Sequence, residues 1–180
     1  MKEQLVEQRL SELALYDYFW FDTGELVFSP RIRWICRHEC PMYGKSWACP
    51  PGVGTVEQCR ARCLSYPRGL CISTVAEVAD ISDIQATLAT RGDHERITDA
   101  VAEILREQGV EVYTLSTESC AVCDRCAIAD GKPCRRPERM HPCVESQGIV
   151  ISDLAEKHGI AFQYGGNVVT WFSLLLFRQD

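Results

Sequence analysis

Apolar residues along the chain alternate between helix-like and strand-like spacing. The clearest helix is predicted over 93–109, where apolar side chains recur on one face and Gly109 supplies a stop. Further helices are predicted over 5–15, 56–65 and 148–159. Strands are predicted over 69–78, 110–116 and 167–177. Because helices alternate with strands, we expect an α/β or α+β fold in which helices pack on a mixed sheet.

The segments before and around the first cysteines give weaker signals. "YFWF" and "ELVF", separated by "DTG", suggest a hairpin, and "RIRWIC" alternates polar and apolar residues, which predicts a strand that delivers Cys36. A stretch rich in proline and glycine follows from Cys40 to Gly54. The 180 residues fit one domain over 1–180, with cysteine-rich subregions at 36–71 and 120–143.

Charge and hydropathy exclude several classes of protein. The formal net charge of -6 argues against a nucleic-acid binder, which is usually basic. The longest apolar run, 168–177, is too short to span a bilayer and fits a buried strand. The amino terminus carries acidic residues and has no signal-peptide core, so we expect a cytoplasmic protein without a membrane partner.

The chain contains an unusual number of cysteines. There are eleven, an odd number, and a cytoplasmic compartment is reducing, so metal binding or redox chemistry is favoured over disulfides. They are Cys36, Cys40, Cys49, Cys59, Cys63, Cys71, Cys120, Cys123, Cys126, Cys134 and Cys143.

The later group begins with C-x2-C-x2-C at Cys120, Cys123 and Cys126, as in bacterial ferredoxins. Cys134 follows after eight positions and is the expected fourth ligand of a [4Fe-4S] cluster. From 120 to 143 the chain has five basic and three acidic residues, a local charge of +2 that suits an anionic cofactor. Spacing alone does not identify the metal, so structural zinc remains the alternative.

The earlier group is C-x3-C-x8-C-P-P, formed by Cys36, Cys40 and Cys49. Three thiolates would leave one iron of a cluster open to a substrate or another ligand. The spacing is not that of radical enzymes that use S-adenosylmethionine. The expected polar lining of such an open site is His38, Tyr43, Lys45 and Trp47.

The remaining cysteines are candidates for additional ligands. Cys59 and Cys63 are four apart on a predicted helix and share a face, but free cysteine is often simply buried. Cys71 fits a small apolar strand residue. Cys143 is expected within reach of the later group, as a fifth thiol there.

Three segments together resemble a known family. They are "CRHECPMYGKSWACPPG" (36–52), "CAVCDRCAIADGKPCRRPE" (120–138) and "ESQGIVISDLAEKHGI" (145–160). The chain resembles the predicted metal-binding proteins called domain of unknown function 2284, typical of anaerobic bacteria and methanogenic archaea. The resemblance implies metal or iron–sulfur binding and no established reaction. The implied ligands are Cys36, Cys40, Cys49, Cys120, Cys123, Cys126 and Cys134.

These observations predict a cytoplasmic iron–sulfur protein with one or two [4Fe-4S] clusters. Its role would be electron transfer to a redox partner protein, or redox chemistry on a small-molecule substrate at an open iron. The alternative is a zinc-stapled interaction module or a metallochaperone without redox activity. No nucleotide or flavin motif occurs in the sequence.

Overall fold

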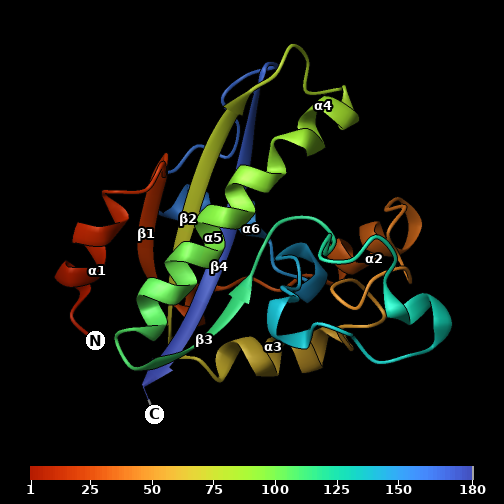
Figure 1. Cartoon of the computed structure of the whole chain (residues 1–180), viewed down its shortest axis with the longest axis horizontal. Helices are drawn as coiled ribbons and strands as arrows, with labels where there is room; N and C mark the ends of the chain where they lie inside the picture. Colours follow the sequence, from red (N-terminus) through yellow and green to blue (C-terminus); the bar gives the residue numbers. More distant parts are fainter. Residues whose placement is uncertain (180) are drawn as a thin grey trace.

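A four-stranded antiparallel sheet forms the centre of the protein in a computed structural model that describes residues 1–179 (Figure 1). The strand order is β1-β2-β4-β3. The strands are β1 (Asp17–Asp22), β2 (Arg68–Glu77), β3 (Val110–Leu115) and β4 (Val168–Gln179). Each neighbouring pair runs antiparallel, so the architecture is α+β, and the sheet is not the mixed sheet that we expected.

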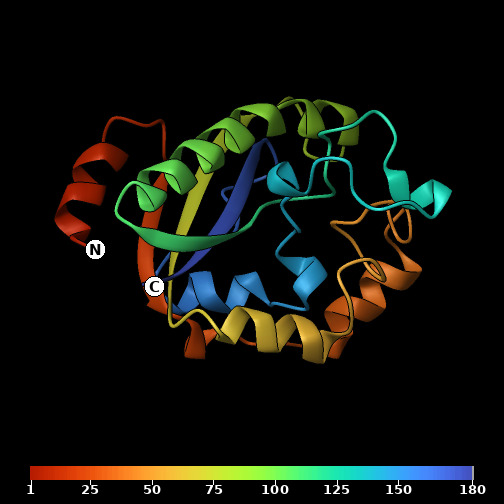
Figure 2. The same cartoon turned by 60° about the horizontal axis from the view of Figure 1, so that its bottom comes forward.

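Helices cover both faces of the sheet (Figure 2). On one face, α5 (Arg91–Arg106) and α1 (Glu3–Leu10) pack on side chains such as Leu70 of β2 and Leu175 of β4. On the other, α6 (Ile151–Lys157) and α3 (Val56–Leu64) cover side chains such as Leu174. The central strands β2 and β4 are therefore buried on both sides, which explains their continuous apolar runs.

Most predicted elements are present with boundaries shifted by a few residues. Two predictions were wrong. β1 pairs with β2, and a short 3-10 turn (Thr23–Glu25) follows it instead of a hairpin return. The predicted strand "RIRWIC" lies within helix α2 (Pro30–His38). Ser29 caps this helix by accepting the Arg31 N–H, and Pro30 stands in the first turn, where its missing N–H costs nothing. A short helix, α4 (Ile84–Ala89), was not predicted.

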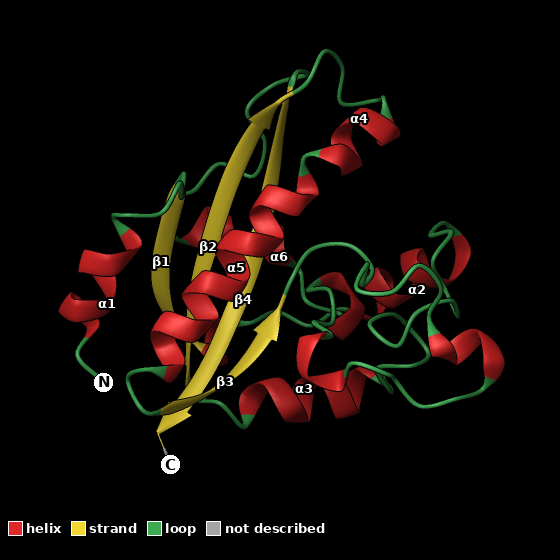
Figure 3. Ribbon diagram, in the orientation of Figure 1, coloured by secondary structure: helices red, strands yellow, loops and turns green. Residues whose placement is uncertain are grey.

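The irregular loops lie beside the sheet, on the side of edge strand β3 (Figure 3). Helix α2 and the irregular chain that follows it meet the long connection between β3 and α6 there. That connection contains only short 3-10 turns as regular structure: Ala127–Asp130, Pro137–Arg139 and Glu145–Gln147. The sheet therefore serves as a frame from which two irregular loops extend.

A buried histidine joins α5 to the sheet and makes stability depend on pH. His94 is 1% exposed, with Nδ1 2.9 Å from Thr74 Oγ1 and Nε2 2.8 Å from Ser173 Oγ. Burial lowers the pKa of His94 from 6.5 to about 4. The unfolded chain therefore binds a proton near pH 6.5 that the folded protein does not accept until pH is about 4.

We expect the free energy of unfolding to fall by about 3 kcal/mol as the pH drops from 6.5 to about 4. Above pH 6.5 His94 is neutral in the folded and the unfolded chain, so it contributes no pH dependence there. Urea titrations at several pH values test this prediction. His94→Gln should remove that part of the pH dependence, while His38→Gln, at an exposed position, should keep it. Equal slopes for wild type and His94→Gln would contradict the assignment.

Candidate metal centres

The four cysteines of the later group line one small cavity. They are Cys120, Cys123, Cys126 and Cys134. The tight C-x2-C-x2-C loop supplies three of the thiols, and the turn at Gly131, with φ 65°, redirects the chain so that Cys134 supplies the fourth. We call this set centre 2. The sequence predicted this grouping, and the structure brings the four residues together.

Burial and crowding of the thiols at centre 2 oppose free thiolates and favour a bound cation or cluster. Burial raises the pKa of Cys120, and the neighbouring Cys134, Cys126 and Cys123 raise it further. Arg135 and Arg136 line the same cavity and favour negative charge there. A metal that displaces the thiol protons would add to this positive charge and stabilise the crowded thiolates.

The earlier group lines a second cavity of about 320 Å³ together with an unexpected member. Its thiols are Cys36, Cys40, Cys49 and Cys143. Cys143 was expected near the later group, and this placement was wrong. A parallel bridge pairs Cys143 with Ser116, directly after β3, and the following turn Glu145–Gln147 packs against α2, which carries Cys36. We call these four thiols centre 1.

Hydrogen bonding links two of the thiols in centre 1. The Cys143 thiol donates to Cys49, which lowers the pKa of Cys49 and raises that of Cys143 well above its usual value. Burial, followed by the charge of Cys40, raises the pKa of Cys36 to about 11. Because the pKa values of Cys36 and Cys143 are raised, a metal that binds centre 1 would have to displace their protons.

Two carboxylates, which the sequence analysis did not identify, also line the cavity of centre 1. Glu118 has a backbone φ of 56°, in the left-handed region that a non-glycine residue seldom adopts. Burial raises the pKa of Glu145. A carboxyl group with a raised pKa keeps its proton more readily. In this neutral form it is not repelled by nearby thiolates.

Trp47 connects the two centres. Its backbone N–H donates to Cys126 Sγ at 3.4 Å, and its indole Nε1–H donates to the Lys132 carbonyl at 3.0 Å. Trp47 stands two residues before Cys49 of centre 1. Cys49 of centre 1 is therefore linked to Cys126 of centre 2 by the short chain segment 47–49 and the N–H···S hydrogen bond of Trp47. Such hydrogen bonds to ligand sulfurs tune the potential of an iron–sulfur cluster.

The three remaining cysteines lie outside both cavities. Cys63 and Cys71 belong to the hydrophobic core, and burial raises the pKa of both thiols. The Cys59 thiol is also buried and donates to the Val53 carbonyl at 3.4 Å. These positions fit packing residues, the simpler of the two interpretations of the sequence.

The expected polar lining of centre 1 is found only in part. Tyr43 lines its cavity. His38 is exposed and stacks on Trp34, and Lys45 is exposed. Trp47 does not line this cavity; its backbone N–H donates to Cys126 of centre 2.

No group of side chains in the described part of the chain is already arranged around a single ion. In residues 1–179, no three His, Cys, Asp or Glu side chains converge closely enough to hold one metal ion. Each of the two cavities nevertheless has four cysteine thiols in its lining, a donor set that iron–sulfur clusters and structural zinc both use.

Comparison with known proteins agrees with a metal-binding role. Residues 19–177 match the model of a family described as "Predicted metal-binding protein (DUF2284)". No curated protein and no solved structure matches the chain. In the part of the chain that the structure describes, no helix has the length and apolar character needed to cross a membrane.

Proposed function

Because the chain belongs to this DUF2284 family of predicted metal-binding proteins, we propose that it is an iron–sulfur electron-transfer protein with two [4Fe-4S] clusters. Centre 1 would hold one cluster and centre 2 the other. The observation that carries this proposal is the arrangement of eight thiols in two sets of four, linked by the N–H···S hydrogen bond of Trp47. When bound, each cluster would supply one-electron redox chemistry.

The fourth thiol of centre 1 favours electron transfer over reaction at an open iron. With only Cys36, Cys40 and Cys49, one iron would lack a protein ligand and could bind substrate. Cys143 lines the same cavity and would fill that position. Two fully ligated clusters joined by a short route suit a protein that receives an electron at one centre and passes it from the other.

The residues around the centres would also adjust their potentials. Arg135 and Arg136 at centre 2 stabilise negative charge and should raise the potential of a cluster there. The carboxylate of Glu118, which lines the cavity of centre 1, would act in the opposite direction. Centre 1 would then be the more strongly reducing of the two, and electrons would pass from centre 1 to centre 2. The rival interpretation, a zinc-stapled interaction module or a metallochaperone, requires neither this difference nor the link through Trp47.

Reduction under anaerobic conditions tests the proposal. We expect the dithionite-reduced protein to give electron paramagnetic resonance signals from two [4Fe-4S]⁺ clusters that interact with each other. Potentiometric titration should resolve two potentials, the higher one sensitive to Arg136→Gln and the lower one to Glu118→Gln. Protein that holds stoichiometric zinc and no reducible centre would overturn the proposal. Labile, substoichiometric metal would favour a metallochaperone.

A further inference from the structure

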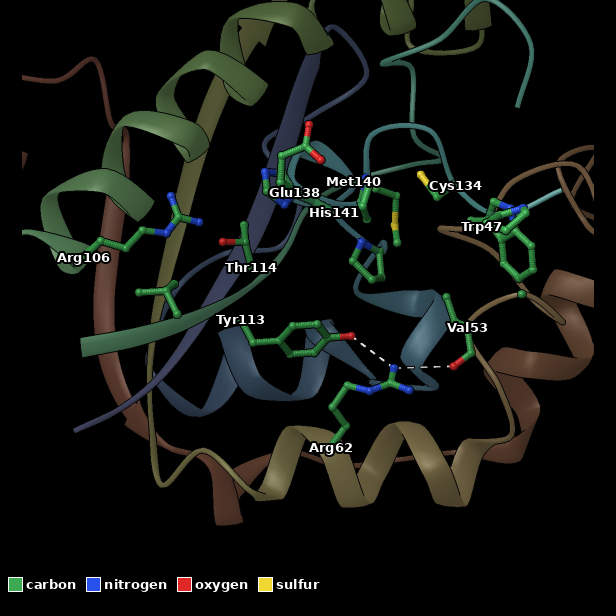
Figure 4. Close-up of a pocket in the computed structure, with 15 residues that line it drawn as sticks. Trp47, Val53, Arg62, Arg106, Tyr113, Thr114, Cys134, Glu138, Met140 and His141 are labelled. Carbon is green, nitrogen blue, oxygen red and sulfur yellow. Dashed lines mark hydrogen bonds between the residues drawn. The ribbon is translucent and has the colours of Figure 1, made fainter. Parts of the chain in front are cut away.

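A cavity of about 560 Å³ lies directly beside centre 2. Edge strand β3, helix α3 and the segment 133–142 enclose it (Figure 4). Cys134 and Met140 line both this cavity and the small cavity of centre 2, so they form the wall between the two. A molecule in the larger cavity would therefore lie against a thiol of centre 2.

Two arginines give this cavity a positive character. Arg62 reaches it from α3 and Arg106 from α5, on opposite sides of β3 (Figure 4). Arg62 Nη1 donates to the Tyr113 hydroxyl at 3.3 Å and to the Val53 carbonyl at 3.5 Å, both long hydrogen bonds. Within residues 1–179, no carboxylate pairs with Arg62. An arginine fork held by two neutral oxygens retains donors for an anion.

A hydroxyl without a partner also lines the cavity. Thr114 is 4% exposed and lines the cavity, and its Oγ1 is buried with no hydrogen-bond partner in the structure of residues 1–179. In Figure 4 this hydroxyl lies on the side of Arg106. A buried hydroxyl without a partner costs free energy, and a ligand oxygen that accepts from it would recover that cost.

The rest of the lining is largely apolar, with Val112, Met140, Pro137 and Pro142 among its members. The volume is in the range of sites for small organic molecules. Arg106 Nη1 lies 3.4 Å from Glu103 Oε2, which is a long ion pair. Glu138 adds one acidic side chain to the lining. We propose that this cavity binds a small organic anion, with its carboxylate or phosphate head at Arg106 and Thr114, its apolar body against Met140, and Arg62 adding positive charge from the other side of β3.

Binding of this anion does not depend on which metal centre 2 holds, so it can succeed or fail separately from the proposed function. The position beside Cys134 makes the anion a candidate for the substrate or regulator of an electron carrier. This role rests on the proposed function, but the binding site does not.

Isothermal titration calorimetry on the anaerobically purified full chain tests the site with three probes. They are 3-phenylpropanoate, phenyl phosphate and the neutral 3-phenylpropanamide, which share an aromatic body and differ in the head. We expect at least one anion to bind about 10-fold or more tightly than the amide, and the stronger of the two identifies the preferred head. Arg106→Gln should weaken anion binding by about 10-fold, and Arg62→Gln and Thr114→Val by about 3-fold each.

Arg60→Gln is the matched control, because Arg60 is exposed on the same helix as Arg62 and does not line the cavity. It should leave anion binding unchanged. The proposal is overturned if the amide binds as tightly as both anions, if neither arginine variant weakens binding, or if no probe binds below about 10 mM. Unchanged circular dichroism and metal content of the variants verify that each one is folded.

Discussion

Cys143→Ala is expected to lose about four of about eight irons per chain while the cluster of centre 2 stays in place. Cys143 contributes the fourth thiol of centre 1 and is hydrogen-bonded to Cys49. Without it, one iron of that cluster has no cysteine ligand, and such clusters are readily lost. Alanine is preferred to serine because a serine oxygen can still bind iron. Iron and sulfide analysis, together with the absorption spectrum, measures the loss.

Two further variants make this result specific. Cys71→Ala removes a buried thiol that lines neither cavity, so it should keep the full iron content. Cys123→Ala should lose the cluster of centre 2 instead, and combining Cys123→Ala with Cys143→Ala should remove nearly all iron. If Cys143→Ala retained wild-type iron, or lost all of it, Cys143 would not belong to a separate first centre.

Metal removal should expose the 117–145 connection to trypsin and increase its cleavage by about 100-fold or more. This connection has little regular structure apart from 3-10 turns, and few of its apolar side chains are buried. Bound metal would therefore supply most of the free energy that fixes its shape. Three exposed basic residues offer cleavage sites, Arg125, Arg135 and Arg139. Lys132 and Arg136 precede proline, so trypsin does not cut after them.

The sheet provides the internal control for this experiment. Far-ultraviolet circular dichroism should change little, because β2, β4 and α5 pack in hydrophobic clusters that include none of the eight thiols of the two centres. Arg96 on α5 should resist cleavage with and without metal. Mass spectrometry of the fragments locates the cuts. A metal-free chain as resistant as the metal-bound protein would show that side-chain packing, rather than metal, holds the loops.

Local signals in the sequence predicted the parts of the fold that local physics determines. The helix α3 begins at a Thr55–Gln58 capping box, and α5 carries an apolar stripe, so both were found. The strand prediction for "RIRWIC" failed because its alternation was given more weight than the Ser29–Pro30 start signal. Helix α2 buries none of its residues, so its pattern carried little information about a core.

The two centres differ in how far the sequence could predict them. Centre 2 draws its four thiols from one stretch of fifteen residues, so its spacing was sufficient to group them. Centre 1 needs Cys143, which is 94 positions after Cys49. The bridge between Ser116 and Cys143 and the packing of the Glu145–Gln147 turn on α2 bring it there. Such long-range contacts leave no periodic signal in the sequence.

Quantifying iron, acid-labile sulfide and zinc in the anaerobically purified wild-type chain tests the central claim most directly. Two sets of four thiols, each holding a [4Fe-4S] cube, predict about eight irons and about eight sulfides per chain, with little zinc. One or two zinc ions per chain without sulfide would contradict the account.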